Sequence, residues 1–199
     1  MNRRSVFISL IFFFLITSCK QSNETLLDKA NELDKKGKHD KAIDIYTKII
    51  KRNNRIQLAY FNRGLTYLKT KNYDKALADF NKIMSLHPTR RGLIFIPNPN
   101  SPFASEVDQM WVPYNDALLE GAIAKYYMDS IKSSFNDFQA LIDINYQKSN
   151  SLLWQGMLWI KNGENDKACE AFIMATQAAS TNFDKDQADN MIDNYCQKK

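Results

Sequence analysis

Few side chains in this 199-residue chain are of the types that carry chemistry: two histidines and three cysteines. The sequence contains no Gly-rich phosphate loop, no Gly-x-Ser-x-Gly nucleophile motif and no His-Glu-x-x-His metal motif. His39 follows a stretch of lysines and a glycine, and His87 precedes a proline, so both are expected to fill turns. Acidic residues are spread along the chain without a convincing pair. We therefore expect no enzyme, no cofactor and no metal site.

Cys19 ends a segment that has the features of a secretory signal. Arginines stand at positions 3 and 4, residues 6–16 are largely apolar, and Thr17 and Ser18 are small. The apolar run of 11 residues is shorter than the roughly 20 that a membrane-spanning helix needs. The stretch from Ile16 to Cys19 resembles the lipobox of bacterial lipoproteins.

That resemblance implies that residues 1–18 are cleaved, that the Cys19 thiol is joined to a diacylglycerol, and that residues 19–22 form a lipidated tether. Two or three acyl chains anchor firmly, because each buried methylene contributes about 0.8 kcal/mol. Lys20 replaces the aspartate that would indicate inner-membrane retention, which favours the outer membrane of the bacterial cell envelope. The alternative is an ordinary secreted protein whose cleavage site happens to precede a cysteine. No other long apolar run occurs, so we expect no transmembrane helix.

Cys169 and Cys196 remain as a pair if Cys19 is lipidated. In an oxidising compartment disulfides persist, and antiparallel helices could bring these two residues together. We predict a disulfide that joins the C-terminal segment to the rest of the chain. The alternative is two free, partly buried thiols; metal binding is not expected, because no ligand stands at suitable spacing.

Charge gives little indication of a polyanionic partner. Removal of residues 1–18 lowers the formal net charge from +5 to +3 and leaves 181 residues, enough for one domain or one short repeat array. No basic stripe interleaved with aromatic residues is apparent, so nucleic-acid binding is not expected.

A sequence pattern that repeats every 34 residues predicts the helices that position these groups. Ala42, Ala76 and Ala168 each complete the phrase Asp-Lys-Ala, and an aromatic residue follows each alanine by four positions. Ser134 begins a weaker copy 34 residues before Ala168. Self-similarity at this period is typical of an all-α helix-turn-helix solenoid. We predict four units, at residues 23–56, 57–90, 115–148 and 149–182.

Within each unit we place helix A at positions 3–14 and helix B at positions 18–31. Small residues are expected where helix A crosses helix B, and an aromatic residue at position 24 fills the space between neighbouring helices. The small residues are Ala30, Gly64, Ala122 and Gly156 at position 8, and Ala42, Ala76, Ser134 and Ala168 at position 20; the aromatic residues are Tyr46, Phe80, Phe138 and Phe172.

The pattern resembles the tetratricopeptide repeat (TPR) family. The second unit matches the signature through Gly64, Tyr67, Tyr73, Ala76, Phe80 and Pro88, and the fourth through Gly156, Trp159, Ala168 and Phe172. The first unit departs at Asn54, which replaces the closing proline, and the third departs at Lys125 and Ser134. The resemblance implies a solenoid that binds other proteins, without specifying which.

The end of the chain, residues 183–199, reads as a capping helix and tail. Small and apolar residues recur at steps of three and four between Asp184 and Cys196. A polar outer face suits a cap, because an uncapped solenoid leaves its last apolar face in water.

An insertion of 24 residues, 91–114, separates units two and three. Three prolines, at positions 97, 99 and 102, exclude a helix there and favour extended backbone. Phe95 and Trp111 belong to stretches that are too apolar for a free linker. The insertion either covers surface between units two and three or forms a partner-binding element, and the two can both hold.

In the TPR family the concave groove is lined by helix A positions 2, 5, 9 and 12. Carried over to this chain from unit two onward, the resemblance implies a largely apolar groove. Its predicted residues are Leu58, Phe61, Leu65, Leu68, Leu119, Ile123, Tyr126, Leu153, Met157 and Ile160. Some of them belong to the core instead if the register is misplaced. The basic clamp with which chaperone-docking members hold a carboxylate is missing, since Leu27, Asp116 and Glu120 stand in its place.

These features predict a membrane-anchored, non-catalytic adaptor or assembly scaffold at the cell envelope. Three occupants of the groove are open: the chain's own insertion, an apolar or amphipathic segment of another protein, or a second copy of the chain. The alternative function is a ligand-binding lipoprotein, for a glycan or a peptide, in which Trp111, Tyr114 and Tyr126 stack on glycan rings.

Overall fold

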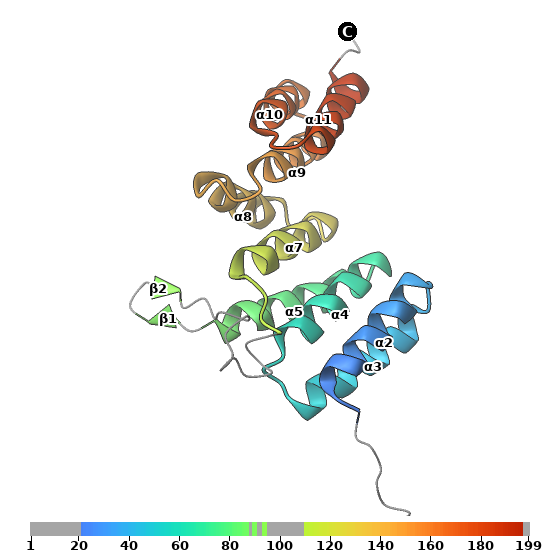
Figure 1. Cartoon of the computed structure of the whole chain (residues 1–199). Coiled ribbons are helices and arrows are strands. Elements are labelled where there is room, and N and C mark those ends of the chain that lie inside the picture. Colours follow the sequence, from blue (N-terminus) through green and yellow to red (C-terminus); the bar gives the residue numbers. More distant parts are fainter. Residues whose placement is uncertain (1–20, 88, 91–92, 95–109, 197–199) are drawn as a thin grey trace, which may run out of the picture.

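The computed structural model describes residues 21–87, 89–90, 93–94 and 110–196, and nine helices lie within them. Four antiparallel pairs follow one another along the array, and a final helix covers its end (Figure 1). The pairs are α2 (Asn23–Lys35) with α3 (His39–Arg52), α4 (Gln57–Lys69) with α5 (Tyr73–Leu86), α7 (Tyr114–Tyr127) with α8 (Ile131–Asp143), and α9 (Lys148–Lys161) with α10 (Asn165–Ala178); the last helix is α11 (Asn182–Tyr195). The predicted all-α solenoid is confirmed, and its helices begin and end within three residues of the predicted positions.

The same position of every unit makes the turn from helix A to helix B. At position 15 the backbone is left-handed in all four units, with φ of 71° at Gly37, 60° at Lys71, 57° at Asp129 and 79° at Gly163. Glycine adopts this conformation without a steric cost, whereas Lys71 and Asp129 bear about 1 kcal/mol of strain. The sharp turn keeps the two helices of a unit antiparallel and in contact.

Small residues face aromatic rings where the helices of a unit cross. Tyr46, Phe80, Phe138 and Phe172 are at most 1% exposed. A methyl group added to Gly64 would lie 2.8 Å from the ring of Phe80, closer than carbon atoms pack. Ser134 fits its small position because its hydroxyl donates a hydrogen bond of 2.8 Å to the Ala122 carbonyl oxygen on helix A.

Helix α11 caps the array as predicted. Its Ala188 is fully buried, and Met191 and Ile192 pack against the core that α9 and α10 form. Cys169 of α10 and Cys196, which directly follows α11, form the predicted disulfide with a Cα–Cα distance of 5.7 Å. The last helix is therefore joined to its neighbour covalently.

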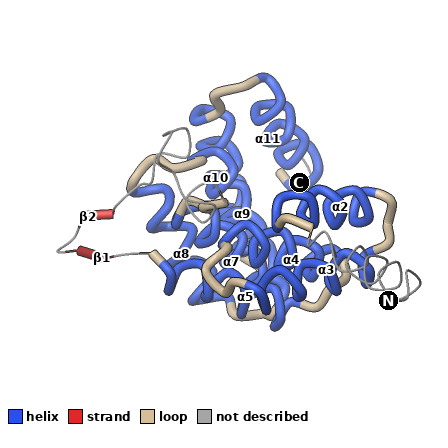
Figure 2. Tube along the Cα trace, turned by 60° about the horizontal axis from the view of Figure 1, so that its bottom comes forward, coloured by secondary structure: helices blue, strands red, loops and turns tan. Residues whose placement is uncertain are grey.

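Of the insertion, residues 91–114, the structure describes 93–94 and 110–114. Strand β1 (Thr89–Arg90) pairs antiparallel with β2 (Leu93–Ile94), beyond the end of α5 (Figure 2). Met110 packs in the core of unit one and Val112 in the core of unit two. Two hydrogen bonds of 2.9 Å hold this segment: Leu58 N–H donates to the Met110 carbonyl, and Val112 N–H donates to the side-chain Oε1 of Gln57. Its end thus joins the cores of two units.

Two predicted features of the chain remain predictions. Cys19 and the signal segment lie outside the described residues, as does Phe95. Among the described helices, none combines the length and the apolarity that crossing a membrane requires.

The crossing of α9 and α10 should tolerate no added methyl group. In Gly156→Ala the new methyl would overlap the Phe172 ring, with 2.6 Å to Cδ1. We expect this variant to lose about 1–3 kcal/mol of unfolding free energy, measured by chemical denaturation. Gly121→Ala in α7 is the matched control, because its methyl would meet its nearest neighbours at 3.7 Å. It should gain up to about 1 kcal/mol from helix propensity. Equal changes in unfolding free energy for the two variants would contradict the close packing of Gly156 against the Phe172 ring.

Candidate functional site

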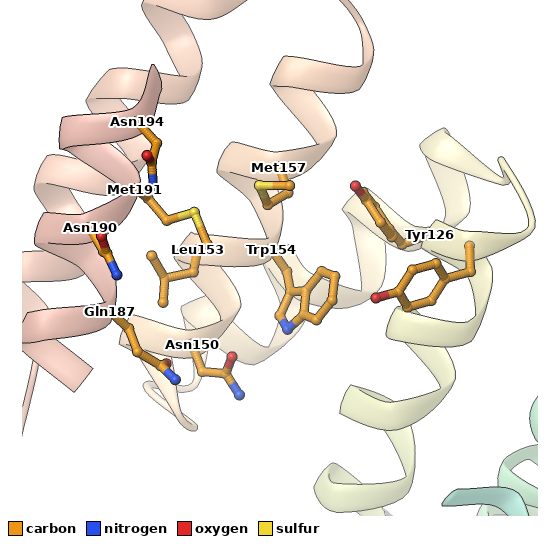
Figure 3. A pocket seen from close by; sticks show the side chains of 10 residues that line it. Tyr126, Asn150, Leu153, Trp154, Met157, Gln187, Asn190, Met191 and Asn194 are labelled. Carbon is orange, nitrogen blue, oxygen red and sulfur yellow. The ribbon is translucent and has the colours of Figure 1, made fainter. Parts of the chain in front are cut away.

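A cavity of about 590 Å³ lies between three helices near the C-terminal end of the array. Helix α9 forms its floor, α7 one side and α11 the other (Figure 3). We call it the C-terminal cavity. Its lining residues are Tyr126, Tyr127, Asn150, Leu153, Trp154, Met157, Gln187, Asn190, Met191 and Asn194.

Aromatic rings that support one another form the α7 side of the cavity. Tyr126 and Tyr127 both meet Trp154 edge-on, with ring centroids 5.2 and 6.0 Å apart. Tyr73 of α5 stacks on Tyr127 at 4.9 Å. Lys161 lies over the Tyr126 ring at 4.4 Å and donates a 2.8 Å hydrogen bond to the carbonyl oxygen of Tyr126. These contacts hold the rings in place before any ligand arrives.

Apart from Asn150 the floor is apolar or aromatic, and three of the four residues on the opposite wall are carboxamides. Leu153 and Met157 lie on α9, and the carboxamides of Gln187, Asn190 and Asn194 project from α11 (Figure 3). The α11 residues follow steps of three and four, so they share one face of the helix. None of the described side chains that line the cavity is charged at neutral pH. A charged ligand group would lose water there without gaining a counter-charge.

A second cavity of about 430 Å³ adjoins the first and shares Asn150 and Gln187 with it. Lys148 and Asp184 bring charge to this part, and Phe183 is nearby with 68% of its surface exposed. The two cavities together form a groove between α9 and the length of α11. The C-terminal cavity forms the uncharged part of this groove, and the second cavity forms the part that contains charged side chains.

The concave face of units one and two is different, because its polar groups already bind one another. Its cavity of about 200 Å³ contains Asp34, which pairs with Lys69 and lies 2.8 Å from Nδ1 of His39. Burial opposes ionisation of Asp34, but the hydrogen bonds from Lys69 and His39 outweigh it and lower its pKa. Asn31 accepts hydrogen bonds from Tyr46 and from Asn62. Little hydrogen-bonding capacity is left for a ligand.

The structure distributes the ten predicted groove residues over several environments. Tyr126, Leu153 and Met157 line the C-terminal cavity, and Leu65 lines the smaller cavity of units one and two. Leu119 is only 3% exposed and lies in the core of unit three. The remaining residues are partly buried against the cores of their units: Leu58, Phe61, Leu68, Ile123 and Ile160.

The sequence predicted α11 as a cap alone, so the four cavity residues that this helix supplies were missed. Trp154 and the α11 residues Gln187, Asn190, Met191 and Asn194 were not proposed as groove residues. The three carboxamides on one face of an otherwise ordinary cap were the available signal.

His87 also differs from its predicted role as a turn filler. It is 7% exposed, and its Nε2 lies 2.9 Å from the Val112 carbonyl oxygen, so the ring nitrogen donates and holds the end of the insertion. Trp111 and Tyr114 contact this ring edge-on. Burial lowers the His87 pKa, which keeps the ring neutral. Trp111 and Tyr114 therefore belong to the insertion contact and not to the cavity that contains Tyr126.

The middle of the concave face has acidic side chains, Asp116 and Glu120, and not the basic residues of a carboxylate clamp. Asp116 accepts hydrogen bonds from the Tyr146 hydroxyl, at 2.5 Å, and from Gln147. One turn along α7, burial first and the Asp116 carboxylate second raise the pKa of Glu120 to about 7. A ligand carboxylate would be repelled at this place.

The tetratricopeptide repeat family matches this chain at residues 24–55 and 58–90. Dynein axonemal assembly factor 4 of Mus musculus is 34% identical over 84 residues, which cover 42% of this chain and 20% of that protein. TPR repeat-containing protein MJ1428 of Methanocaldococcus jannaschii is 24% identical over 186 residues, covering 80% of this chain and 30% of its own length. The matches thus span only 20% and 30% of the length of these curated relatives.

A solved structure, MamA 41-end from Desulfovibrio magneticus RS-1, has the same fold with a TM-score of 0.61. It is 16% identical, and the match covers 80% of this chain and 76% of that one. The repeat matches and the paired helices together show an all-helical array of the tetratricopeptide-repeat type. Proteins of this class are typically non-catalytic scaffolds that bind proteins or peptides.

The raised pKa of Glu120 predicts a pH dependence of stability. A carboxyl whose pKa rises from 4.5 to about 7 on folding stabilises the native state below pH 4.5, and this contribution is lost as the pH rises through 7. At pH 8, Glu120→Gln should therefore be about 1–3 kcal/mol more stable than the parent, with the difference shrinking towards pH 4.5. Urea denaturation between pH 4.5 and 8 measures this. Glu170→Gln, at an exposed glutamate of α10, is the control for the loss of a carboxyl group. A stability difference between Glu120→Gln and the parent that stays constant with pH would contradict the raised pKa of Glu120.

Proposed function

We propose that this chain is a non-catalytic protein-interaction adaptor at the bacterial cell envelope, anchored through a lipidated Cys19. In this proposal the C-terminal cavity binds an uncharged, extended segment of a partner protein. The uncharged carboxamide wall opposite an aromatic and apolar floor carries this proposal.

The lining matches the groups of a peptide main chain. A carboxamide offers both a donor and an acceptor, as a peptide unit does. From Gln187 to Asn194 the wall extends about 10 Å, which corresponds to about three residues of extended chain. A volume of about 590 Å³ also leaves room for apolar side chains against Leu153, Met157 and Trp154.

The tether supports a partner that lies close to the membrane. Helix α2 begins at Asn23, four residues after Cys19. Such a link reaches about 14 Å at most when fully extended. The array would stand directly above the lipid surface, so we propose an outer-membrane adaptor whose partner is also in the envelope.

A glycan ligand is the weaker alternative. The three aromatic residues that suggested it are divided, because Trp111 and Tyr114 contact His87 whereas Tyr126 lines the cavity. A single aromatic platform for sugar rings is therefore not formed by these three.

Peptide selectivity tests the site. Cellulose-bound arrays of decapeptides with uncharged side chains should bind the purified full chain, and copies bearing an aspartate at the centre should not. Asn190→Asp combined with Asn194→Asp places two carboxylates on exposed positions of the wall. We expect at least tenfold weaker binding of uncharged decapeptides by this variant, and a gain for copies bearing lysine.

Asn81→Asp makes the same change at an exposed position of α5 and should leave binding unaltered. Equal effects of the two changes would reject the cavity as the site. Binding of soluble oligosaccharides together with no binding of any decapeptide would favour the glycan alternative instead.

Membrane attachment is tested separately through Cys19. Cys19→Ala should move the protein from the membrane fraction to the soluble fraction, because it removes two or three acyl chains at once. Fractionation of cells followed by immunoblotting measures this. Retention of the variant in membranes to the parental extent would contradict the lipid anchor.

A further inference from the structure

One wall of the C-terminal cavity depends on a helix with little burial of its own. Helix α11 supplies four of the ten lining residues, the last of them Asn194. Helix α9 buries seven residues and α10 buries four, whereas Ala188 alone is buried on α11. Met191 and Ile192 are only partly buried. Burial therefore holds α11 less firmly than α9 or α10, although Tyr195 near its end also contacts the Phe172 ring at 6.1 Å.

The two ends of α11 are held in different ways. At its beginning a three-residue link from α10 leads into the Thr181 cap, whose hydroxyl accepts a 3.1 Å hydrogen bond from Asp184 N–H. In the middle, Thr176 of α10 donates to Asp189. At its end the Cys169–Cys196 disulfide fixes the chain two residues beyond Asn194. Both cysteines are partly exposed, so the bond does not lie in the buried core.

We propose that the Cys169–Cys196 disulfide is a redox switch of the ligand cavity. This inference rests on the proposed function of that cavity. The oxidised form holds Asn190, Met191 and Asn194 against α9, and reduction releases the C-terminal half of α11 and opens the wall. Gln187 stays in place, because Ala188 and the Thr181 cap retain the first half of the helix.

The chemistry is a thiol–disulfide exchange. A dithiol reductant cleaves the Sγ–Sγ bond, transfers two electrons and two protons to the protein, and leaves as its own cyclic disulfide. The protein then carries two thiols. A disulfide-bearing oxidant that accepts two electrons and two protons restores the bond and closes the wall.

Amide hydrogen exchange tests the release directly. The probe is dithiothreitol, added to the full chain in detergent, with thiol counting to verify reduction. We expect exchange of residues 190–195 to accelerate at least tenfold, while residues 150–158 and the first half of α11 change little. Cys169→Ser combined with Cys196→Ser should resemble the reduced form and should not respond to dithiothreitol. Unchanged exchange at 190–195 would overturn the inference.

Binding by the oxidised and reduced proteins separates this inference from the proposed function. Uncharged decapeptides that bind the oxidised chain should bind the reduced chain and the double serine variant at least tenfold more weakly. Equal binding by the two forms would overturn the switch and leave the peptide site standing. Absence of decapeptide binding even by the oxidised chain would reject the peptide site and, with it, the switch.

Discussion

The close crossing of two helices over an aromatic ring is the interaction on which the array depends. An added methyl group at Gly64 or Gly156 would overlap the ring that faces it, so the backbones at these crossings are about as close as they can be. Since all four units use the same contact, successive A helices are presented on one face. The concave surface follows from that repetition, and only its lining differs from unit to unit.

The two halves of that surface have different chemistry. In units one and two, Asp34, Lys69 and their neighbours satisfy one another, so a ligand would have to break existing bonds. In the C-terminal half, exposed carboxamides of α11 face a fixed aromatic side, and the cavity is uncharged. An oxidising compartment favours the Cys169–Cys196 disulfide. In the proposed switch, that bond keeps the α11 wall of the C-terminal cavity in place.

Period and spacing predicted the fold well because these features are local. The 34-residue register predicted the helix pairs and the aromatic position, and the steps of three and four after Asp184 predicted the capping helix. The disulfide was predicted from the two cysteines that remain in an oxidising compartment if Cys19 is lipidated. The site was only partly predictable, since the orientation of a residue on helix A depends on how neighbouring units rotate. Leu119, for example, lies in the core of unit three and does not line the groove. The α11 wall was missed because an amphipathic cap and a cavity wall have the same sequence period.

We propose that α9 and α11 together form the ligand site. Amide hydrogen exchange of the oxidised full chain, with and without a bound uncharged decapeptide, tests this most directly. We expect slower exchange in residues 150–157 and 187–194, with no change in α2 and α3. Slower exchange confined to α2–α4 or to residues 89–113, with α9 and α11 unaffected, would contradict it.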